Sequence, residues 1–276
     1  MAAPEPHPSK LFRRAALGLV ALAALVGVLL ASEGNSGGFD TFSGEAMATR
    51  WEVVLPEGPD AEAAARECLD LFSRLDLELS EWKEGSPLSA VNRAAGERPV
   101  AVPQELYDLL ARSLDIARAT DGAFDPTWAA LWGLWDFRSE TPALPGAEAV
   151  AARTRLVDYR RVELDAAART VYLPERGMQL GLGAIGKGYA LDRAAALLEA
   201  RGRHDFLLVG GGQVLARGKK GKRPWRIGVR DPRGGARDLF ARVDVSGASL
   251  STSADNESFF FVDGARYHHI LDPRTG

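Results

Sequence analysis

Residues 181–188 have the sequence Gly-Leu-Gly-Ala-Ile-Gly-Lys-Gly, and they open an apolar helix that we expect to run from Lys187 to Arg201. The first six residues match the G-x-G-x-x-G pattern, in which backbone N–H groups at a helix start hold phosphate. A doubly wound α/β fold also needs an acidic residue at the end of the next strand. The next expected strand, residues 206–209, ends instead in three glycines. The sequence therefore disfavours a Rossmann fold, although the backbone near Lys187 can still approach an anion closely.

Helices are expected mainly in the first half of the chain and short strands in the second. We predict helices from Asp60 to about Trp82 and from Pro103 to Thr120, each begun by a residue that favours a helix start. The expected strands cover residues 47–55, 170–173, 206–209, 225–229, 239–245 and 258–262. Because strands and helices do not alternate regularly, this order predicts an α+β fold.

Two groups of side chains are predicted to belong to the core. Cys68 lies on an apolar stripe with helical spacing, so packing is its expected role. Trp128, Trp132 and Trp135 follow the helix-start signal Asp125-Pro126 at i, i+4, i+7 spacing and are expected to form one buried aromatic face. The remaining members of the Cys68 stripe are Leu71, Phe72, Leu75 and Leu79.

The N-terminus carries a candidate membrane segment. Basic residues precede an uncharged run, residues 15–31, that is slightly short for the hydrocarbon core of a bilayer. We predict that residues 1–32 form a basic cytoplasmic flank with a signal or anchor helix, and Leu29 favours an uncleaved anchor over a secreted form. Residues 33–44 would be a flexible tether, and residues 45–276 would form one domain on the extracytoplasmic, periplasmic side of the inner membrane.

Composition limits the classes of partner. The 276 residues carry a net charge of −3, with 46% hydrophobic and 26% charged residues. We expect no nucleic-acid partner, because the basic run at residues 217–223 is short and glycine-broken, which is typical of a solvated hairpin tip. The single cysteine excludes an intrachain disulfide.

The C-terminal residues hold the candidate acid–base chemistry. His268 and His269 follow an expected strand and precede the turn Asp272-Pro-Arg-Thr-Gly276, whose composition is also that of an ordinary loop. Only one of two adjacent residues in a strand points to a given face, so at most one histidine should face a site. Imidazole beside an anionic phosphate is suited to act as a general base, although a histidine at a strand end is more often only a satisfied polar residue.

Six spaced motifs follow one another along the chain. They are Met47-Ala-Thr49, Glu81-Trp-Lys83 with Ser86-Pro-Leu-Ser-Ala-Val-Asn-Arg93, Asp121-Gly-Ala-Phe-Asp-Pro126, Gly181 to Gly188, Ser251-Thr-Ser-Ala-Asp255, and Tyr267 to Gly276. In their residues and their order, from about Met47 to Gly276, the chain resembles the FAD:protein FMN transferases, the ApbE-like flavin transferases. The resemblance implies an ApbE-like, T-fold-related mixed domain. It also implies Mg²⁺-dependent transfer of FMN from FAD to a serine or threonine of an acceptor protein, such as a redox-complex subunit or a secreted flavoprotein, with release of AMP.

The same resemblance implies roles for individual residues. His269, rather than His268, matches the catalytic base, and the carbonyl of Ala184 matches a Mg²⁺ ligand. The positions that match residues lining or bordering FAD are Met47, Trp82, Ala123, Phe124, Asp125, Gly181, Lys187 and Ile270.

This sequence departs from the family pattern in two respects. The family usually carries Asp where this chain has Gly181, and Gly210 and Gln213 stand where Asn and Asp are common. The family also continues past Gly276 with acidic metal ligands, so we expect the C-terminal end to be missing and the activity of this chain to be weak. Two alternatives follow, a non-catalytic FAD-binding protein and an FAD pyrophosphatase that uses water as the acceptor.

Overall fold

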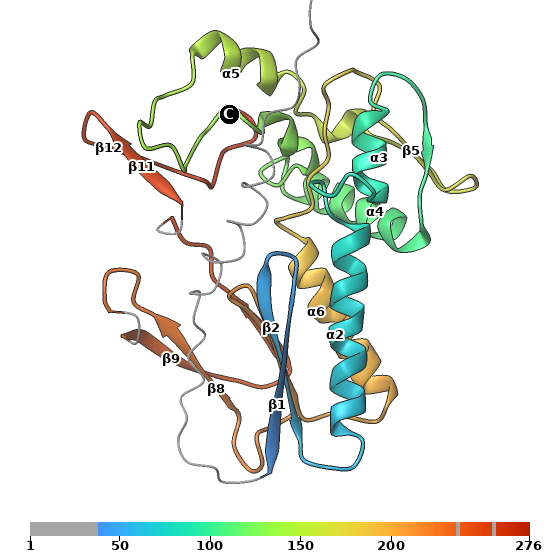
Figure 1. The fold of residues 1–276 in the computed structure, drawn as a ribbon, viewed down its shortest axis with the longest axis vertical. Coiled ribbons are helices and arrows are strands. Elements are labelled where there is room, and N and C mark those ends of the chain that lie inside the picture. Colours follow the sequence, from blue (N-terminus) through green and yellow to red (C-terminus); the bar gives the residue numbers. More distant parts are fainter. Residues whose placement is uncertain (1–37, 236–237, 256–257) are drawn as a thin grey trace, which may run out of the picture. The chain divides into compact units, whose positions relative to one another are not determined.

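A computed structural model describes residues 38–235, 238–255 and 258–276 (Figure 1). The predicted anchor helix lies outside these residues, and none of the described helices is long and apolar enough to cross a bilayer. The predicted tether at residues 33–44 needs correction where it is described, because strand β1 already begins at Phe39. All eight residues of β1 are paired with β2, which supplies the hydrogen bonds that a free tether would lack.

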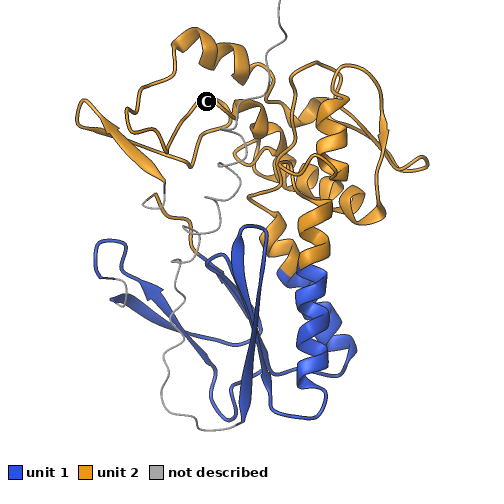
Figure 2. Ribbon diagram, in the orientation of Figure 1, with its two compact units in different colours: residues 1–72, 191–251 blue, residues 73–190, 252–276 orange. Residues whose placement is uncertain are grey.

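The described residues form two compact units that interleave along the chain (Figure 2). The first contains the residues up to Phe72 together with Leu191–Ser251, and the second contains Ser73–Ala190 together with Thr252–Gly276. Helices α2 (Ala61–Glu78) and α6 (Gly186–Ala200) each contribute residues to both units. The prediction of a single domain over residues 45–276 did not anticipate this division.

An antiparallel five-stranded sheet forms the centre of the first unit, with the strand order β1-β2-β6-β7-β10. The strands of this sheet are β1 (Phe39–Ala46), β2 (Thr49–Pro56), β6 (Phe206–Gly210), β7 (Gln213–Arg217) and β10 (Ala248–Ser251). A separate hairpin consists of β8 (Trp225–Arg230) and β9 (Leu239–Val245). The turn between β1 and β2 contains Met47 and Ala48, both with positive φ.

Both faces of this sheet are covered by apolar side chains. On one face Trp51 of β2 stacks on Phe72 of α2, with ring centroids 4.0 Å apart. On the other face, alternate residues of β2, β6 and β7 pack with the β8–β9 hairpin around Trp225 and Ile227. This alternation is the period of two that places successive strand residues on opposite faces. The first unit is therefore a layered α+β structure, as the sequence predicts.

The second unit is mainly helical. Its short sheet has the order β3-β5-β4, and the hairpin β11–β12 stands apart from it. The elements are α3 (Pro87–Arg93), β3 (Val100–Ala101), α4 (Gln104–Ala119), the 3₁₀ helix η2 (Pro126–Leu131), α5 (Ala147–Thr154), η3 (Tyr159–Arg161), β4 (Glu163–Asp165), β5 (Thr170–Tyr172), β11 (Phe259–Val262) and β12 (Ala265–His268).

Local sequence accounts for several of these boundaries. Pro103 directly precedes α4, and Leu106, Leu109, Leu110 and Ala117 of this helix are buried as predicted. Helix α3 begins after Ser86, whose hydroxyl accepts the N–H of Ser89 at 2.9 Å. The Cys68 stripe of α2 is buried, from Cys68 at 0% exposure to Leu79 at 4%. The predicted basic hairpin tip lies between β7 and β8, and residues 219–223 are exposed.

The predicted buried tryptophan face is wrong. The helix that follows Asp125 is a 3₁₀ helix that ends at Leu131, and Trp132 adopts an extended conformation with ψ 137°. The i, i+4, i+7 spacing therefore does not keep the three indoles on one face. Trp132 is 38% exposed, and Trp128 and Trp135 are only half-buried.

Candidate functional site

The glycine-rich segment before α6 is held from two sides. The side chain of Asn92 on α3 donates to the carbonyl of Leu180 at 2.9 Å and accepts the Leu180 N–H at 2.8 Å. The next residue, Gly181, donates its N–H to the carbonyl of Pro126 at 2.9 Å. Its own carbonyl accepts the indole N–H of Trp128 at 3.1 Å. Leu180 and Gly181, which lead into α6, are thus fixed by contacts with α3 and η2.

Gly181 occupies a position that has no room for a side chain. A Cβ atom there would lie 2.9 Å from the Cβ of Ala129 and 3.2 Å from the indole nitrogen of Trp128. Both polar backbone groups of this buried glycine are also engaged within the chain. The indole of Trp128 therefore takes the space that the side chain of an aspartate would need.

Lys187 lies one residue inside α6 and is half-buried beside Glu81. Burial lowers the pKa of the Lys187 ammonium, and the negative charge of Glu81 acts in the opposite direction. Burial likewise raises the pKa of the Glu81 carboxyl, against backbone hydrogen bonds and the charge of Lys187. The Glu81 carboxylate and the Lys187 ammonium therefore stabilise each other's charged forms in a partly buried environment. The sequence motif contained Glu81, but nothing in its spacing indicated this pairing.

The backbone around Ala184 is the candidate oxygen donor for a metal ion. Ala184 is exposed. The Leu182 carbonyl accepts the N–H of Gly186 at 2.7 Å and the Ile185 carbonyl accepts that of Tyr189 at 3.0 Å, whereas the Ala184 carbonyl accepts no backbone hydrogen bond from the described residues. The Ala184 carbonyl therefore lies outside the helical hydrogen-bond ladder, and a carbonyl oxygen suits hard Mg²⁺. Among the described residues, no group of three or more His, Cys, Asp or Glu side chains is arranged to hold a metal. The Ala184 carbonyl can thus supply one oxygen ligand, and a complete Mg²⁺ site would need further oxygen donors.

The segment Ala123-Phe124-Asp125 turns the chain into η2. Asp125 is buried, and one carboxylate oxygen accepts both the N–H of Thr127 at 2.8 Å and its hydroxyl at 2.6 Å. The other oxygen accepts the N–H of Tyr159 at 3.0 Å. Asp125 therefore holds this turn together, while Ala123 is exposed and Phe124 is half-buried beside it.

Trp82 is the most exposed of the large hydrophobic residues among the predicted site positions, at 64%. Its ring packs edge-on against Trp132, with centroids 4.3 Å apart, and Trp132 packs at a tilt against Trp128 at 5.0 Å. Because Trp128 also binds the Gly181 carbonyl, these contacts join Trp82 to the glycine-rich segment. The spacing of the tryptophans predicts a core position for Trp128 and Trp132, and it gives no indication of this link.

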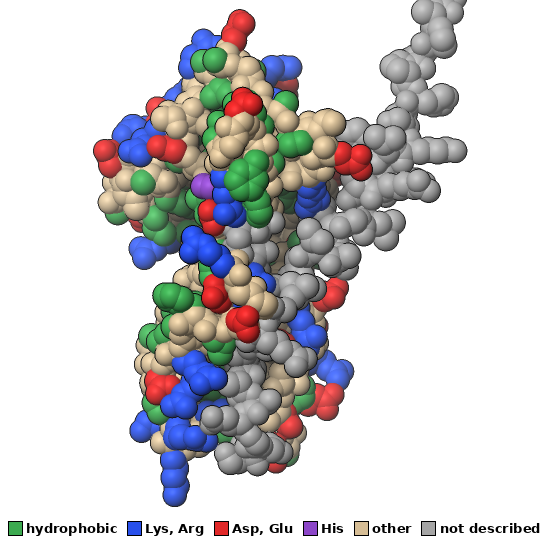
Figure 3. Space-filling model, turned by 90° about the vertical axis from the view of Figure 1, so that its left-hand side faces the viewer, with side chains coloured by type: hydrophobic (Ala, Val, Ile, Leu, Met, Phe, Trp, Pro, Cys, Tyr) green, Lys and Arg blue, Asp and Glu red, His purple; other side chains and the backbone are tan. Residues whose placement is uncertain are grey.

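The β11–β12 hairpin positions the histidines. The backbone N–H of His269 donates to the carbonyl of Ser258 at 3.0 Å, and its ring Nδ1 lies 3.2 Å from the same oxygen. A carbonyl can only accept, so Nδ1 carries the proton, and Nε2 of the neutral ring is left as an acceptor. His268 instead accepts the N–H of Ile270 through Nδ1 at 3.3 Å. Figure 3 shows a histidine at the surface beside hydrophobic and basic side chains.

The remaining predicted residues lie in different places. Ile270 follows His269 and is 46% exposed. Met47 belongs to the first unit, in the turn between β1 and β2, whereas the other predicted site residues belong to the second unit. Trp132 and Trp128 thus connect Trp82 to Gly181, and Glu81 interacts electrostatically with Lys187. His269 and Ile270 are neighbours on the C-terminal segment.

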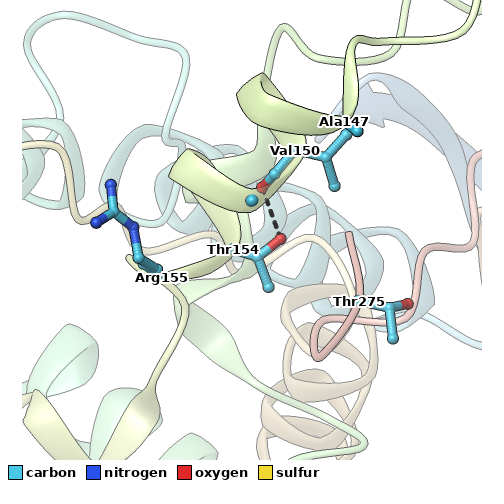
Figure 4. Close-up of a pocket in the computed structure, with 6 residues that line it drawn as sticks. Ala147, Val150, Thr154, Arg155 and Thr275 are labelled. Atoms are coloured by element: carbon cyan, nitrogen blue, oxygen red, sulfur yellow. Dashed lines mark hydrogen bonds between the residues drawn. The ribbon is translucent and has the colours of Figure 1, made fainter.

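Two cavities lie elsewhere in the second unit. One of about 520 Å³ is lined by α5 residues, Arg155 and Thr275. Figure 4 shows α5 on one side of it and Thr275 on the other, with the hydroxyl of Thr154 bonded to the carbonyl of Val150 at 2.8 Å. Another of about 340 Å³ lies beside Tyr159. Neither of these two cavities is lined by a predicted site residue, so neither marks the candidate site.

The α+β fold, the glycine-rich helix entry and the oriented histidine agree with the resemblance that the sequence motifs indicate. The chain belongs to the ApbE family, whose model matches residues 47–276. This result confirms the family and the fold that the motifs predict.

Individual relatives agree with this assignment. The chain is 38% identical over 239 residues to a FAD:protein FMN transferase of Treponema pallidum (strain Nichols), covering 81% of this chain and 66% of the relative. It is 32% identical over 243 residues to a FAD:protein FMN transferase of Klebsiella pneumoniae (strain 342), covering 84% and 69%. The chain thus spans about two thirds of the length of these curated relatives. The crystal structure of the ApbE protein of Thermotoga maritima superimposes with a TM-score of 0.77 at 34% identity, covering 86% of this chain and 77% of that one.

Proposed function

We propose that this protein transfers FMN from FAD to a serine or threonine hydroxyl of an acceptor protein and releases AMP. Membership of the ApbE family and relatives named FAD:protein FMN transferase support this activity. The structural observation that carries the proposal is the orientation of His269 by the carbonyl of Ser258.

In this proposal, Nε2 of His269 accepts the proton of the attacking hydroxyl. A threonine or serine hydroxyl is a weak nucleophile, and a positioned base contributes about 10²- to 10⁴-fold to such a step. The hydroxyl oxygen forms a bond to the phosphorus of the FMN half of FAD, and the bond from that phosphorus to the bridging oxygen breaks. AMP leaves with this oxygen and its electron pair.

The glycine-rich entry of α6 and Lys187 would hold the diphosphate of FAD. Backbone N–H groups at a helix start favour anions, and the ammonium group of Lys187 adds a positive charge nearby. Mg²⁺ bound at the Ala184 carbonyl would neutralise phosphate oxygens and draw charge from the reacting phosphorus. The residues of this chain would position the donor, and His269 would carry the proton.

The acceptor in this proposal is a flavoprotein on the extracytoplasmic side of a membrane, either a redox-complex subunit or a secreted protein. The basic flank and apolar run at residues 1–32 support this location, since the basic end should stay in the cytoplasm.

A direct test mixes the protein with FAD, Mg²⁺ and an acceptor protein that carries a threonine site, and measures the mass of the acceptor. The proposal predicts the mass gain of one esterified FMN and an equal amount of AMP. AMP released without any acceptor would favour FAD hydrolysis instead. FAD bound at 1:1 stoichiometry, with no AMP formed and no mass gain, would favour a non-catalytic binding protein.

A further inference from the structure

Three tryptophans form a continuous aromatic wall beside the glycine-rich segment, defined here as Trp82, Trp132 and Trp128. Trp82 and Trp132 are 64% and 38% exposed, although large aromatic side chains are usually covered. Their rings meet at 76° with centroids 4.3 Å apart, so they form a corner that is open to solvent. Two adjacent exposed indoles are a surface that a ligand can cover with a gain in free energy.

The wall is held in place before any ligand binds. The hydroxyl of Ser80 accepts the N–H groups of Trp82 and Lys83, both at 3.2 Å. The hydroxyl of Ser89 donates to the carbonyl of Glu81 at 3.0 Å, which ties the Trp82 turn to α3. At the other end, Trp128 is fixed by its hydrogen bond to Gly181. Preorganised aromatic surfaces bind without the cost of ordering side chains.

The geometry of the corner suits a planar heteroaromatic ring. A ring stacked on one indole would meet the other edge-on, and both arrangements are favourable for aromatic pairs. The wall is joined to the segment that leads into α6 and Lys187, where a negatively charged group is expected to bind. A ligand that carries both a flat ring and a phosphate therefore matches the two neighbouring surfaces.

We propose that Trp132, together with Trp82, stacks on a planar heteroaromatic ring of the nucleotide ligand, with Trp128 fixing this wall to the glycine-rich segment. The inference rests on the proposed function for the identity of the nucleotide, FAD, which carries two such rings. It adds Trp132 as a ring-binding residue and Trp128 as a positioning residue.

The test measures dissociation constants of the full chain for FAD, FMN and AMP by calorimetry, with no acceptor present. Stacking of a base on an aromatic side chain is worth about 1–3 kcal/mol by alanine substitution. We therefore expect Trp132→Ala to raise the dissociation constant for FAD by about 5- to 150-fold. The same loss should appear with FMN if the isoalloxazine ring stacks on the wall, or with AMP if the adenine ring does.

Three further variants separate stacking from general effects. Trp132→Phe should retain most of the affinity, whereas Trp132→Leu, which is apolar but has no aromatic face, should lose most of it. Phe240→Ala removes an aromatic side chain that is 78% exposed in the first unit, and it should leave all three constants unchanged. Thermal unfolding of each variant checks that it is folded.

Unchanged affinity of Trp132→Ala for FAD, FMN and AMP would overturn the inference, and so would equal affinity of Trp132→Leu and Trp132→Phe. The outcome is independent of catalysis. If the unaltered chain binds FAD through the wall but transfers no FMN, the inference stands and the proposed function fails. If the unaltered chain transfers FMN and Trp132→Ala binds FAD with unchanged affinity, the proposed function stands and the inference fails.

Discussion

Burial of Lys187 makes the positively charged form of its side chain less stable than in water. Burial lowers its pKa, and the negative charge of Glu81 works against that effect. Since Lys187 is expected to hold the FAD diphosphate, its protonated form is the one that binds. Lys187→Ala should therefore weaken FAD binding, and a preserved dissociation constant would count against a phosphate contact at this residue.

Replacing Glu81 by Gln should change how FAD affinity depends on pH. Without the carboxylate, the pKa of Lys187 falls further, because the interaction that raises it is lost while burial remains. Affinity should then decrease at a lower alkaline pH than in the unaltered protein. The measurement is the FAD dissociation constant between neutral pH and the ordinary lysine pKa of about 10.4.

Glu84→Gln is the matched control for this experiment, because Glu84 is an exposed carboxyl three residues away. It should leave the pH profile of binding unchanged. Identical profiles for Glu81→Gln and the unaltered protein would show that Glu81 does not support the charge of Lys187.

Cys68 should be inert in the folded protein. It is fully buried on the α2 stripe, and burial raises the pKa of its thiol to about 12. Only the thiolate reacts with thiol reagents, and at pH 8 this form is scarce and inaccessible. We expect a disulfide-exchange reagent to label no cysteine in the native protein at pH 8 and one per chain in guanidinium chloride. Rapid labelling of the native protein would contradict the buried position.

At the scale of elements, the packing of η2 against the glycine-rich segment explains why position 181 is a glycine. Gly181→Ala would place its Cβ 2.9 Å from Ala129 and 3.2 Å from Trp128. Such overpacking costs about 1–3 kcal/mol, so thermal unfolding should occur at a lower temperature. Ala129→Gly removes the nearest atom and should restore part of the loss in the double variant.

Gly186→Ala provides the matched control within the same segment. A Cβ at Gly186 would meet no other atom within 4 Å, and alanine favours a helix over glycine. This variant should be as stable as the unaltered protein or more so. Equal destabilisation by both substitutions would show that the close contact with η2 is not the cause.

Sequence periodicity predicts the buried face of an element well where the chain forms a regular α-helix. The buried faces of α4 and α6 agree with prediction, because 3.6-residue spacing places Leu106 and Leu110, or Leu191 and Leu198, on one face of a regular helix. The prediction of a buried tryptophan face failed because η2 ends at Leu131. Beyond that residue, helical spacing does not place side chains on one face. The contact between Trp82 and Trp132 joins residues fifty positions apart, and no local pattern indicates it.

At the scale of the whole molecule, each unit is assembled from two separate parts of the chain. The five-stranded sheet of the first unit combines β1 and β2 with β6, β7 and β10, which follow more than a hundred residues later. Such pairings depend on tertiary contacts, which explains why the order of elements predicted the α+β class but not the two units. The motifs located candidate residues, while the roles of Glu81, Trp128 and Trp132 emerge only from three-dimensional contacts.

The central claim is that His269, oriented by the carbonyl of Ser258, acts as the base for FMN transfer. The most direct measurement is the rate of FMN transfer to an acceptor protein under single-turnover conditions, for the unaltered chain, His269→Ala and His268→Ala, each saturated with FAD and Mg²⁺. We predict that His269→Ala lowers this rate by about 10²- to 10⁴-fold with little change in FAD affinity, and that His268→Ala has a far smaller effect. An unchanged rate for His269→Ala, or an equal loss in both variants, would contradict the claim.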